Sequence, residues 1–262
     1  MFLFENKFSM TKEQNIFVAK RNLIDFIWKS ANLEGIGITF PDTYTICNGM
    51  ALSGYTVDDI NKVNDLKKGW EFILATIDRD IDVEYIKELH KIVGKNTVLN
   101  AGNFKLDATG VGGTDWISPP SSEIIVKMEL KEIFKIQNIT ERSLNLMLYL
   151  MRGQLFYDGN KRIATLIGNK EMIRGGAGII SIPIDKQSVF LQMLVKFYET
   201  NNKDDIMKYL YNDCIDGMNF NKTNDKEKIP ENSIKNLVKQ AEAKLKQDNI
   251  TDIKKKNMDI DL

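Results

Sequence analysis

The sequence predicts a mainly α-helical protein with one short β-hairpin, and three observations carry that prediction. Apolar residues recur at helical spacing through most of the first 218 residues. One of these stretches, 140–154, is apolar on nearly every face, as expected for a buried helix at the centre of a bundle. Strand signals are restricted to the glycine-rich segment 102–120 and a short extended piece, 178–185.

The N-terminal helices can be placed from their ends. We expect the first at 11–35, because Thr11 and Gln14 have capping-box spacing and Gly35 can end the helix. Segments 56–78 and 82–95 repeat their apolar residues with the same period and supply two more amphipathic helices.

The hairpin comes next along the chain. Gly110, Gly112 and Gly113 fall close together, which predicts a tip that reaches positive φ. A proline pair at 119–120 then begins the next helix, with the sequence of residues 121–134.

The second half of the chain is again helical. Residues 161–176 follow the central helix and end at a pair of glycines, and two further helical segments cover 187–202 and 203–218. We divide the chain into an N-terminal helical region, 1–55, a core, 56–218, and a charged, partly disordered tail, 219–262, with an isolated helix at 234–247.

Composition narrows the class of protein. Apolar residues make up 43% and charged residues 27%, and the formal net charge is zero, so a soluble protein is expected and nucleic acid is not favoured as a partner. Two cysteines and one histidine, in no metal spacing, argue against a zinc site and fit a reducing cytoplasm. We find neither a signal peptide nor an apolar run of membrane-spanning length, and we therefore expect a cytoplasmic protein.

The clearest chemistry lies in RGQLFYDGNKRIAT, residues 152–165, a tight turn between two helices. The first turn of a helix offers free backbone N–H groups and partial positive charge, and Gly159 lets a ligand approach the backbone. Lys161 and Arg162 add cationic charge, and Asp158 offers the oxygen ligand that a hard cation such as Mg²⁺ prefers. The residues alone thus indicate a nucleotide–phosphate site. A simple capped helix start, with Asp158 as the cap, is the alternative.

QLFYDGNKRIAT resembles the signature of the Fic/Doc (Fido) family, H-x-F-x-D/E-G-N-G/K-R, at Phe156, Asp158, Gly159, Asn160 and Arg162. The resemblance extends over roughly residues 30–215, where GVGGTDWISPP is similar to the family's flap hairpin and ELHKIVG to its upstream helix. SANLEG, 30–35, fits the family's inhibitory pattern.

This resemblance implies a Fido-type helical bundle with a β-hairpin flap, and transfer of AMP from ATP to a Ser, Thr or Tyr hydroxyl of a protein. It implies that Asp158 binds Mg²⁺ and that Gly159, Asn160, Lys161 and Arg162 bind the nucleotide. The catalytic roles fall to Gln154 and Arg162. The inhibitory residues are Ser30, Glu34 and Gly35, and the residues that position the target on the flap are Gly112, Gly113, Thr114, Asp115 and Trp116.

Three residues depart from the family pattern. Gln154 replaces the catalytic histidine, and an amide can orient a hydroxyl but cannot act as a general base. His90 could replace that base only if it lay in the pocket; the alternative is a helix residue near the core.

Lys161 stands where AMP-transferring members mostly have glycine. Doc, a family member with the same N-K-R run, is a kinase, so Lys161 favours phosphate transfer. Thr165 replaces the arginine that would pair with Glu34, so Glu34 needs Lys161 or Arg162 as its partner.

Three functions remain open at this point. The first is an attenuated transferase that moves AMP, or phosphate, onto a protein hydroxyl. The second is a pseudoenzyme that binds a nucleotide or a partner protein as an antitoxin-like or regulatory module. The third is a purely structural helical domain. No membrane partner is expected, and the oligomeric state is left open.

Overall fold

Two helices that are covered on nearly all sides form the centre of the fold. In the computed structural model, which describes residues 3–50 and 52–220, these are α7 (Ile139–Gly153) and α8 (Asn160–Arg174). They pack against each other more extensively than any other pair of elements. The buried position predicted for the central helix is confirmed in α7, but α8 is covered to a similar degree because its buried polar residues find partners inside the protein.

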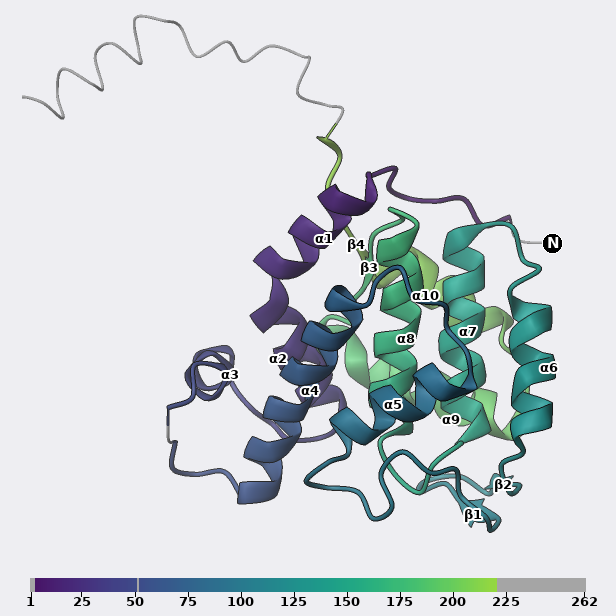
Figure 1. Ribbon diagram of the computed structural model, residues 1–262, viewed down its shortest axis with the longest axis horizontal. Coiled ribbons are helices and arrows are strands. Elements are labelled where there is room, and N and C mark those ends of the chain that lie inside the picture. The colour runs from purple at the N-terminus through teal and green to yellow at the C-terminus, as the bar shows by residue number, and fades with distance from the viewer. Residues whose placement is uncertain (1–2, 51, 221–262) are drawn as a thin grey trace, which may run out of the picture. The chain divides into compact units, whose positions relative to one another are not determined.

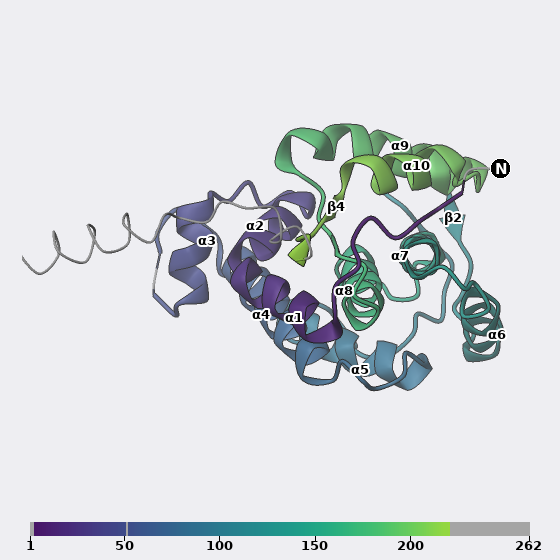
Figure 2. The same ribbon diagram turned by 90° about the horizontal axis from the view of Figure 1, so that it is seen from above.

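The other helices surround this pair on two sides. Figure 2 shows α7 and α8 close to end-on, with α1 (Lys12–Arg21), α4 (Val57–Ala75) and α5 (Val83–Val93) along one side. The other side is covered by α9 (Gln187–Thr200) and α10 (Asp204–Asp213), and α6 (Glu123–Ile133) lies beside α7. Residues up to Asn219 form one compact unit (Figure 1), and the predicted helix at 234–247 lies outside the described residues.

The expectation of one helix at 11–35 is wrong. The Thr11–Gln14 capping box is present, but the helix divides at Asn22 into α1 and α2 (Leu23–Leu33). Asn22 has φ −105° and ψ 16°, outside the helical region. The break changes the direction of the chain, so that α1 packs on α8 whereas α2 packs on α4.

Two further boundaries differ from the sequence prediction. An additional helix, α3 (Phe40–Cys47), begins at the Thr39 cap. The helix after the proline pair begins only at Glu123, because Ser121 still lies in an extended segment and its N–H donates to the carbonyl of Lys105.

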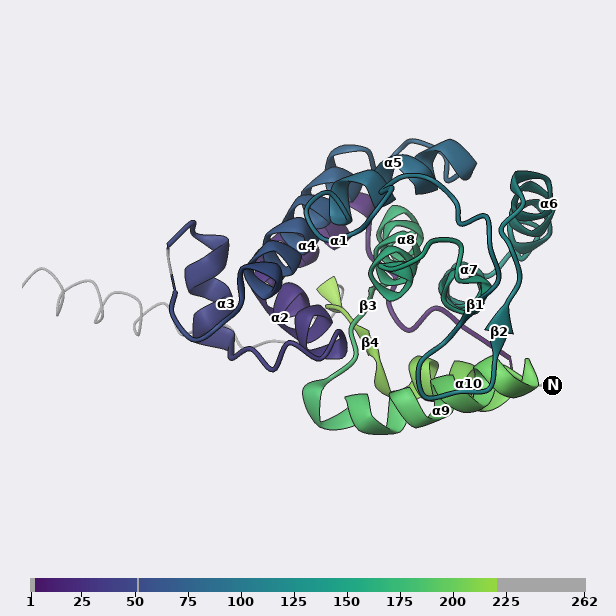
Figure 3. The same cartoon turned by 90° about the horizontal axis from the view of Figure 1, so that it is seen from below.

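The strands are short and form two antiparallel pairs. β1 (Thr109–Gly110) and β2 (Ile117–Ser118) make the predicted hairpin, which Figure 3 shows at the edge of the bundle near α7. We call residues 109–118 the flap. β3 (Ile179–Ile180) pairs with β4 (Ile215–Asp216), a partner that the sequence did not reveal. None of the helices in the described ranges is long and apolar enough to cross a membrane.

Candidate nucleotide-binding site

The loop between α7 and α8 is shaped by Gln154. This residue ends α7 in the left-handed conformation, with φ 43°, which costs a non-glycine residue roughly 1–2 kcal/mol. Its side-chain amide donates to the carbonyl of Met151 at 2.6 Å, and its Oε1 accepts from the amide of Asn160 at 3.0 Å. Gln154 is therefore bonded on both sides within the loop.

Asn160 braces the same loop from the first turn of α8. Its Oδ1 accepts from the backbone N–H of Phe156 at 3.0 Å, and its Nδ2 donates to the carbonyl of Phe156 at 2.8 Å as well as to Gln154. Because these bonds use the side-chain amide, what Asn160 can offer a ligand is its backbone N–H.

His90 supports the loop from beneath and does not line the cavity above it. The residue is fully buried on α5, and its ring stacks on Phe156 with the centroids 3.6 Å apart. Its Nδ1 accepts from the N–H of Gly102 at 2.8 Å, which makes Nε2 the donor to the carbonyl of Asp158 at 3.0 Å. Burial lowers the pKa of His90 to about 4. His90 is thus a neutral core residue rather than a replacement base.

Arg162 is also directed away from the cavity. Its side chain is only 1% exposed, and it donates to the carbonyl of Val93, at the end of α5, at 2.7 Å. A second nitrogen lies 3.4 Å from the carboxylate of Asp158. The cation thus lies at the C-terminal end of α5, a favourable place for positive charge. The structure therefore does not bring Arg162 to the cavity wall, where the sequence expectation had placed it.

Lys161 does reach the cavity, and it is held by the end of α2. Its ammonium donates to the carbonyl of Leu33 at 3.1 Å and lies 3.7 Å from the Glu34 carboxylate. Glu34 also lies 3.6 Å from Nε of Arg162. Both expected partners of Glu34 are present, but Arg162 meets it through one nitrogen and not through a bidentate fork.

A Schellman motif fixes the position of Glu34. α2 ends at Leu33, and Gly35 follows with φ 80°. The N–H of Gly35 donates to Asn32 and that of Ile36 to Ala31, the two bonds of that motif. The backbone carbonyl of Ser30 accepts the N–H of Glu34, and Ser30 does not line the cavity.

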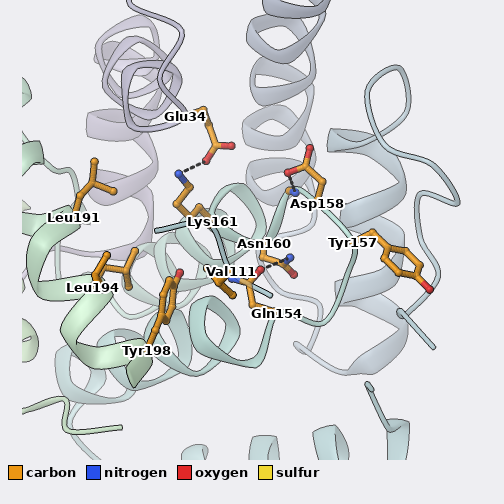
Figure 4. A pocket seen from close by; sticks show the side chains of 13 residues that line it. Glu34, Val111, Gln154, Tyr157, Asp158, Asn160, Lys161, Leu191, Leu194 and Tyr198 are labelled. Carbon is orange, nitrogen blue, oxygen red and sulfur yellow. Dashed lines mark hydrogen bonds and ion pairs between the residues drawn. The ribbon is translucent and has the colours of Figure 1, made fainter. Parts of the chain in front are cut away.

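The cavity has a volume of about 410 Å³, a size suited to a small molecule. Figure 4 shows Glu34 beside Lys161, Asp158 to the right of that pair, Gln154 below, and Tyr198 beside Leu194. The apolar wall comes from α9, where Leu191, Leu194, Val195 and Tyr198 line the cavity. Sequence reasoning missed this wall, because these residues follow an ordinary core period with no chemical motif to single them out.

The polar groups of the cavity suit an anion. Gly159 occupies the N-cap position of α8 with φ 78°, and no side chain caps the helix, which excludes the simple capped start considered above. Asp158 accepts from the N–H of its neighbour Gly159 at 2.6 Å, and its side chain is 56% exposed. The free N–H groups of the first turn and the Lys161 ammonium supply positive charge at the cavity.

A metal ion would depend on Asp158. No three acidic, histidine or cysteine side chains within the described ranges come together as a metal cage. A single exposed carboxylate fits Mg²⁺ that is otherwise held by phosphate oxygens and water. The other carboxylate that lines the cavity, Glu34, lies beside Lys161.

Part of the flap reaches the same cavity. Val111 and Gly112 line it, and Gly113 has the predicted positive φ of 79°. Thr114 stabilises the tip by donating to the carbonyl of Val111 at 2.9 Å. Trp116 instead stacks on the guanidinium of Arg152, 3.8 Å from its ring centre, and is not part of the cavity wall. Asp115 is exposed at the tip.

These features define a class of protein: a helical bundle with a short hairpin beside a loop that opens an uncapped helix N-terminus to a cavity. The family model described as "Fic/DOC family" matches residues 80–172, which include the upstream helix, the flap and the loop. The resemblance seen in the sequence is confirmed: over these residues the chain is similar to the Fic/DOC family.

Relatives of known name agree. "Protein adenylyltransferase Fic" of Drosophila willistoni is 25% identical over 202 residues, which cover 73% of this chain and 39% of that protein. The protein of the same name in Drosophila melanogaster is also 25% identical, with 40% of its length covered. The chain thus spans about two fifths of the length of these relatives.

Solved structures share the fold. Fic-1 (aa134 - 508) from C. elegans superposes with a TM-score of 0.63 at 20% identity, over 74% of this chain and 62% of that one. A Fic domain containing signaling protein from Bacteroides thetaiotaomicron gives 0.62 at 20% identity, over 77% and 86%. The predicted fold, a Fido-type helical bundle with a hairpin flap, is therefore confirmed.

Proposed function

We propose that this protein binds ATP in the cavity above α8 and transfers AMP, at an attenuated rate, to a hydroxyl side chain of a target protein. The observation that carries the proposal is the open N-terminus of α8, where Gly159 at φ 78° exposes backbone N–H groups to a cavity of about 410 Å³. The names of the relatives, protein adenylyltransferases, support the type of reaction.

Each group at the cavity has its own role in this proposal. The backbone N–H groups of Gly159, Asn160 and Lys161 hold phosphate oxygens, and the Lys161 ammonium adds charge. Asp158 would hold Mg²⁺, and the ion would supply additional neutralisation of phosphate charge. The apolar wall of α9 excludes water on one side. Arg162 acts from below the loop, where it fixes Asp158 in place.

In the reaction, the target hydroxyl oxygen bonds to the α-phosphorus, the bond to the β-phosphate oxygen breaks, and pyrophosphate leaves. The hydroxyl proton passes to solvent, because no group in the loop accepts it efficiently. Gln154 has no basic form, His90 is buried with both ring nitrogens bonded, and burial raises the pKa of Tyr198. A missing general base typically costs about 10²–10⁴ in rate, which is the attenuation we expect.

Glu34 restrains this site. Its carboxylate lies between the two cations of the N-K-R run, where it repels phosphates and neutralises Lys161. Because Thr165 leaves no arginine one turn further along α8, Lys161 is the partner of Glu34 that reaches the cavity.

A catalytically silent, nucleotide-binding regulatory module is the second candidate. It is favoured by the amide of Gln154, which is engaged by Met151 and Asn160 and so is not displayed to a substrate. A Doc-like kinase is a variant of the first proposal, favoured by the presence of Lys161 at the cavity.

One experiment separates these candidates. The full chain is incubated with Mg²⁺, a cell extract and ATP labelled at either the α- or the γ-phosphate, and modified proteins are read by intact mass. AMP transfer retains the α-label, phosphate transfer retains only the γ-label, and a silent module retains neither while still binding nucleotide.

A further inference from the structure

Lys105 carries a buried positive charge that is held by backbone carbonyls, with Asp107 as the acidic residue whose charge acts on it. Its side chain is 0% exposed, yet no ion pair joins it to a carboxylate within the described residues. Its ammonium donates instead to three backbone carbonyls, those of Asp107 at 3.2 Å, Ser118 at 2.9 Å and Pro119 at 2.7 Å. Burial lowers the pKa of Lys105. Burying an ammonium is costly, and a methionine of similar volume would avoid that cost.

The three carbonyls belong to both arms of the flap. Asp107 precedes β1, whereas Ser118 ends β2 and Pro119 follows it. One ammonium therefore joins the chain entering the flap to the chain leaving it. The hairpin itself has only two residue pairs in register, so its orientation needs support from its base.

The residues that end or flank the flap, which we call the flap base, also bond to the carbonyls on either side of Gln154, those of Gly153 and Leu155. The backbone N–H of Lys105 donates to Leu155 at 3.0 Å, and the hydroxyl of Ser121 donates to the same oxygen at 3.0 Å. The hydroxyl of Ser118 donates to Gly153 at 3.0 Å. The flap base and the left-handed turn at Gln154 are thus one hydrogen-bonded unit.

We infer that Lys105 is a positioning residue, which sets the flap and the turn at Gln154 in a fixed relation by clamping the carbonyls at the flap base. It touches neither the cavity nor any substrate, and its effect passes through Ser118 and Leu155. The inference goes beyond the proposed function, because it describes how the two halves of the site are held together whatever the site transfers.

Hydrogen exchange of the full chain tests this without nucleotide or target. In Lys105→Met, the flap amide of Val111, which donates to Trp116, and the loop amide of Phe156, which donates to Asn160, should both exchange roughly tenfold faster or more. Amides in the middle of α4 should keep their wild-type rates.

Lys170 provides a matched control. It is also 0% exposed and also donates to carbonyls, those of Thr76 at 2.5 Å and Ile77 at 2.8 Å, with its ammonium over the ring of Tyr85, but it lies far from the flap on α8. Lys170→Met should leave the Val111 and Phe156 amides unchanged. A general loss of stability would accelerate these amides in both variants equally.

The inference is overturned if Lys105→Met leaves both amides at their wild-type rates, or if only the flap amide responds while Phe156 does not. Should Lys105→Met fail to fold, Ser118→Ala tests the same unit by removing the bond to Gly153. It should accelerate the same two amides to a smaller extent, and unchanged rates in this variant would equally contradict the clamp.

Discussion

The carboxylate of Glu34, at the C-terminal end of α2, lies 3.7 Å from the ammonium of Lys161, in the first turn of α8. Both groups are fixed by backbone geometry: Glu34 by the Schellman motif, and Lys161 by its bond to Leu33. The pair places negative charge where the proposed phosphates would bind, which leads to the first prediction.

Removing this charge should strengthen nucleotide binding. We expect Glu34→Gln to raise the affinity for ATP with Mg²⁺ roughly threefold to tenfold, because the partly solvent-screened repulsion between carboxylate and phosphate is lost. Isothermal calorimetry on the full chain measures the change. Asp25→Asn is the control on the same helix, since Asp25 pairs with Lys29 at 2.6 Å and does not line the cavity. Equal affinities for wild type and Glu34→Gln would refute an inhibitory role for Glu34.

Restoring a base should restore rate. We expect Gln154→His to increase AMP transfer about 10²–10⁴-fold, since an imidazole can accept the hydroxyl proton. The left-handed backbone at this position tolerates either residue with some strain. Gln154→Ala, which supplies no base, is the control, and labelled transfer to an extract is the readout. If Gln154→His is no faster than Gln154→Ala, the site does not lack a base.

Gly159 should be irreplaceable for two separable reasons. An added Cβ would lie 3.2 Å from Nη2 of Arg162 and 3.4 Å from Nε2 of His90, and the φ of 78° is unfavourable for any side chain. Gly113 has nearly the same φ, 79°, but nothing within 4 Å of an added Cβ. We expect Gly113→Ala to cost roughly 1 kcal/mol of stability and Gly159→Ala to cost more and to weaken ATP binding. Chemical denaturation and calorimetry measure both. Equal effects of the two substitutions would mean that the crowding beneath the loop is unimportant.

The fold should lose stability in mild acid because of His90. Its pKa is about 4 in the folded protein against 6.5 in an unfolded chain, so the unfolded state binds the proton first. Stability is fully present above pH 6.5 and falls as pH decreases towards 4, by about 2 kcal/mol at pH 5. Because His90 is the sole histidine of the chain, His90→Gln should remove most of the pH dependence between 7 and 5. Urea unfolding at several pH values tests this, and a variant that keeps the full wild-type dependence would show that other groups are responsible.

Sequence periodicity predicted the helical bundle, the hairpin and the position of the loop, because each depends on local spacing and on turn residues. It could not predict the break at Asn22, since the apolar pattern continues across it and only the packing of α1 and α2 on different helices requires the bend. The motif identified Arg162 and Asn160 but not their orientation. Arg162 turns towards the end of α5 and Asn160 braces Gln154, and both choices depend on neighbours distant in sequence or on the exact loop geometry.

The central claim is that the cavity above α8 presents the α-phosphate of ATP to a protein hydroxyl. Labelled transfer by the Gln154→His, Glu34→Gln double variant tests it most directly, because that variant has both a base and an unrestrained site. We predict that proteins of the extract retain the label of α-labelled ATP and gain the mass of an adenylyl group. Retention of the γ-label alone, or of no label at all, would contradict the claim.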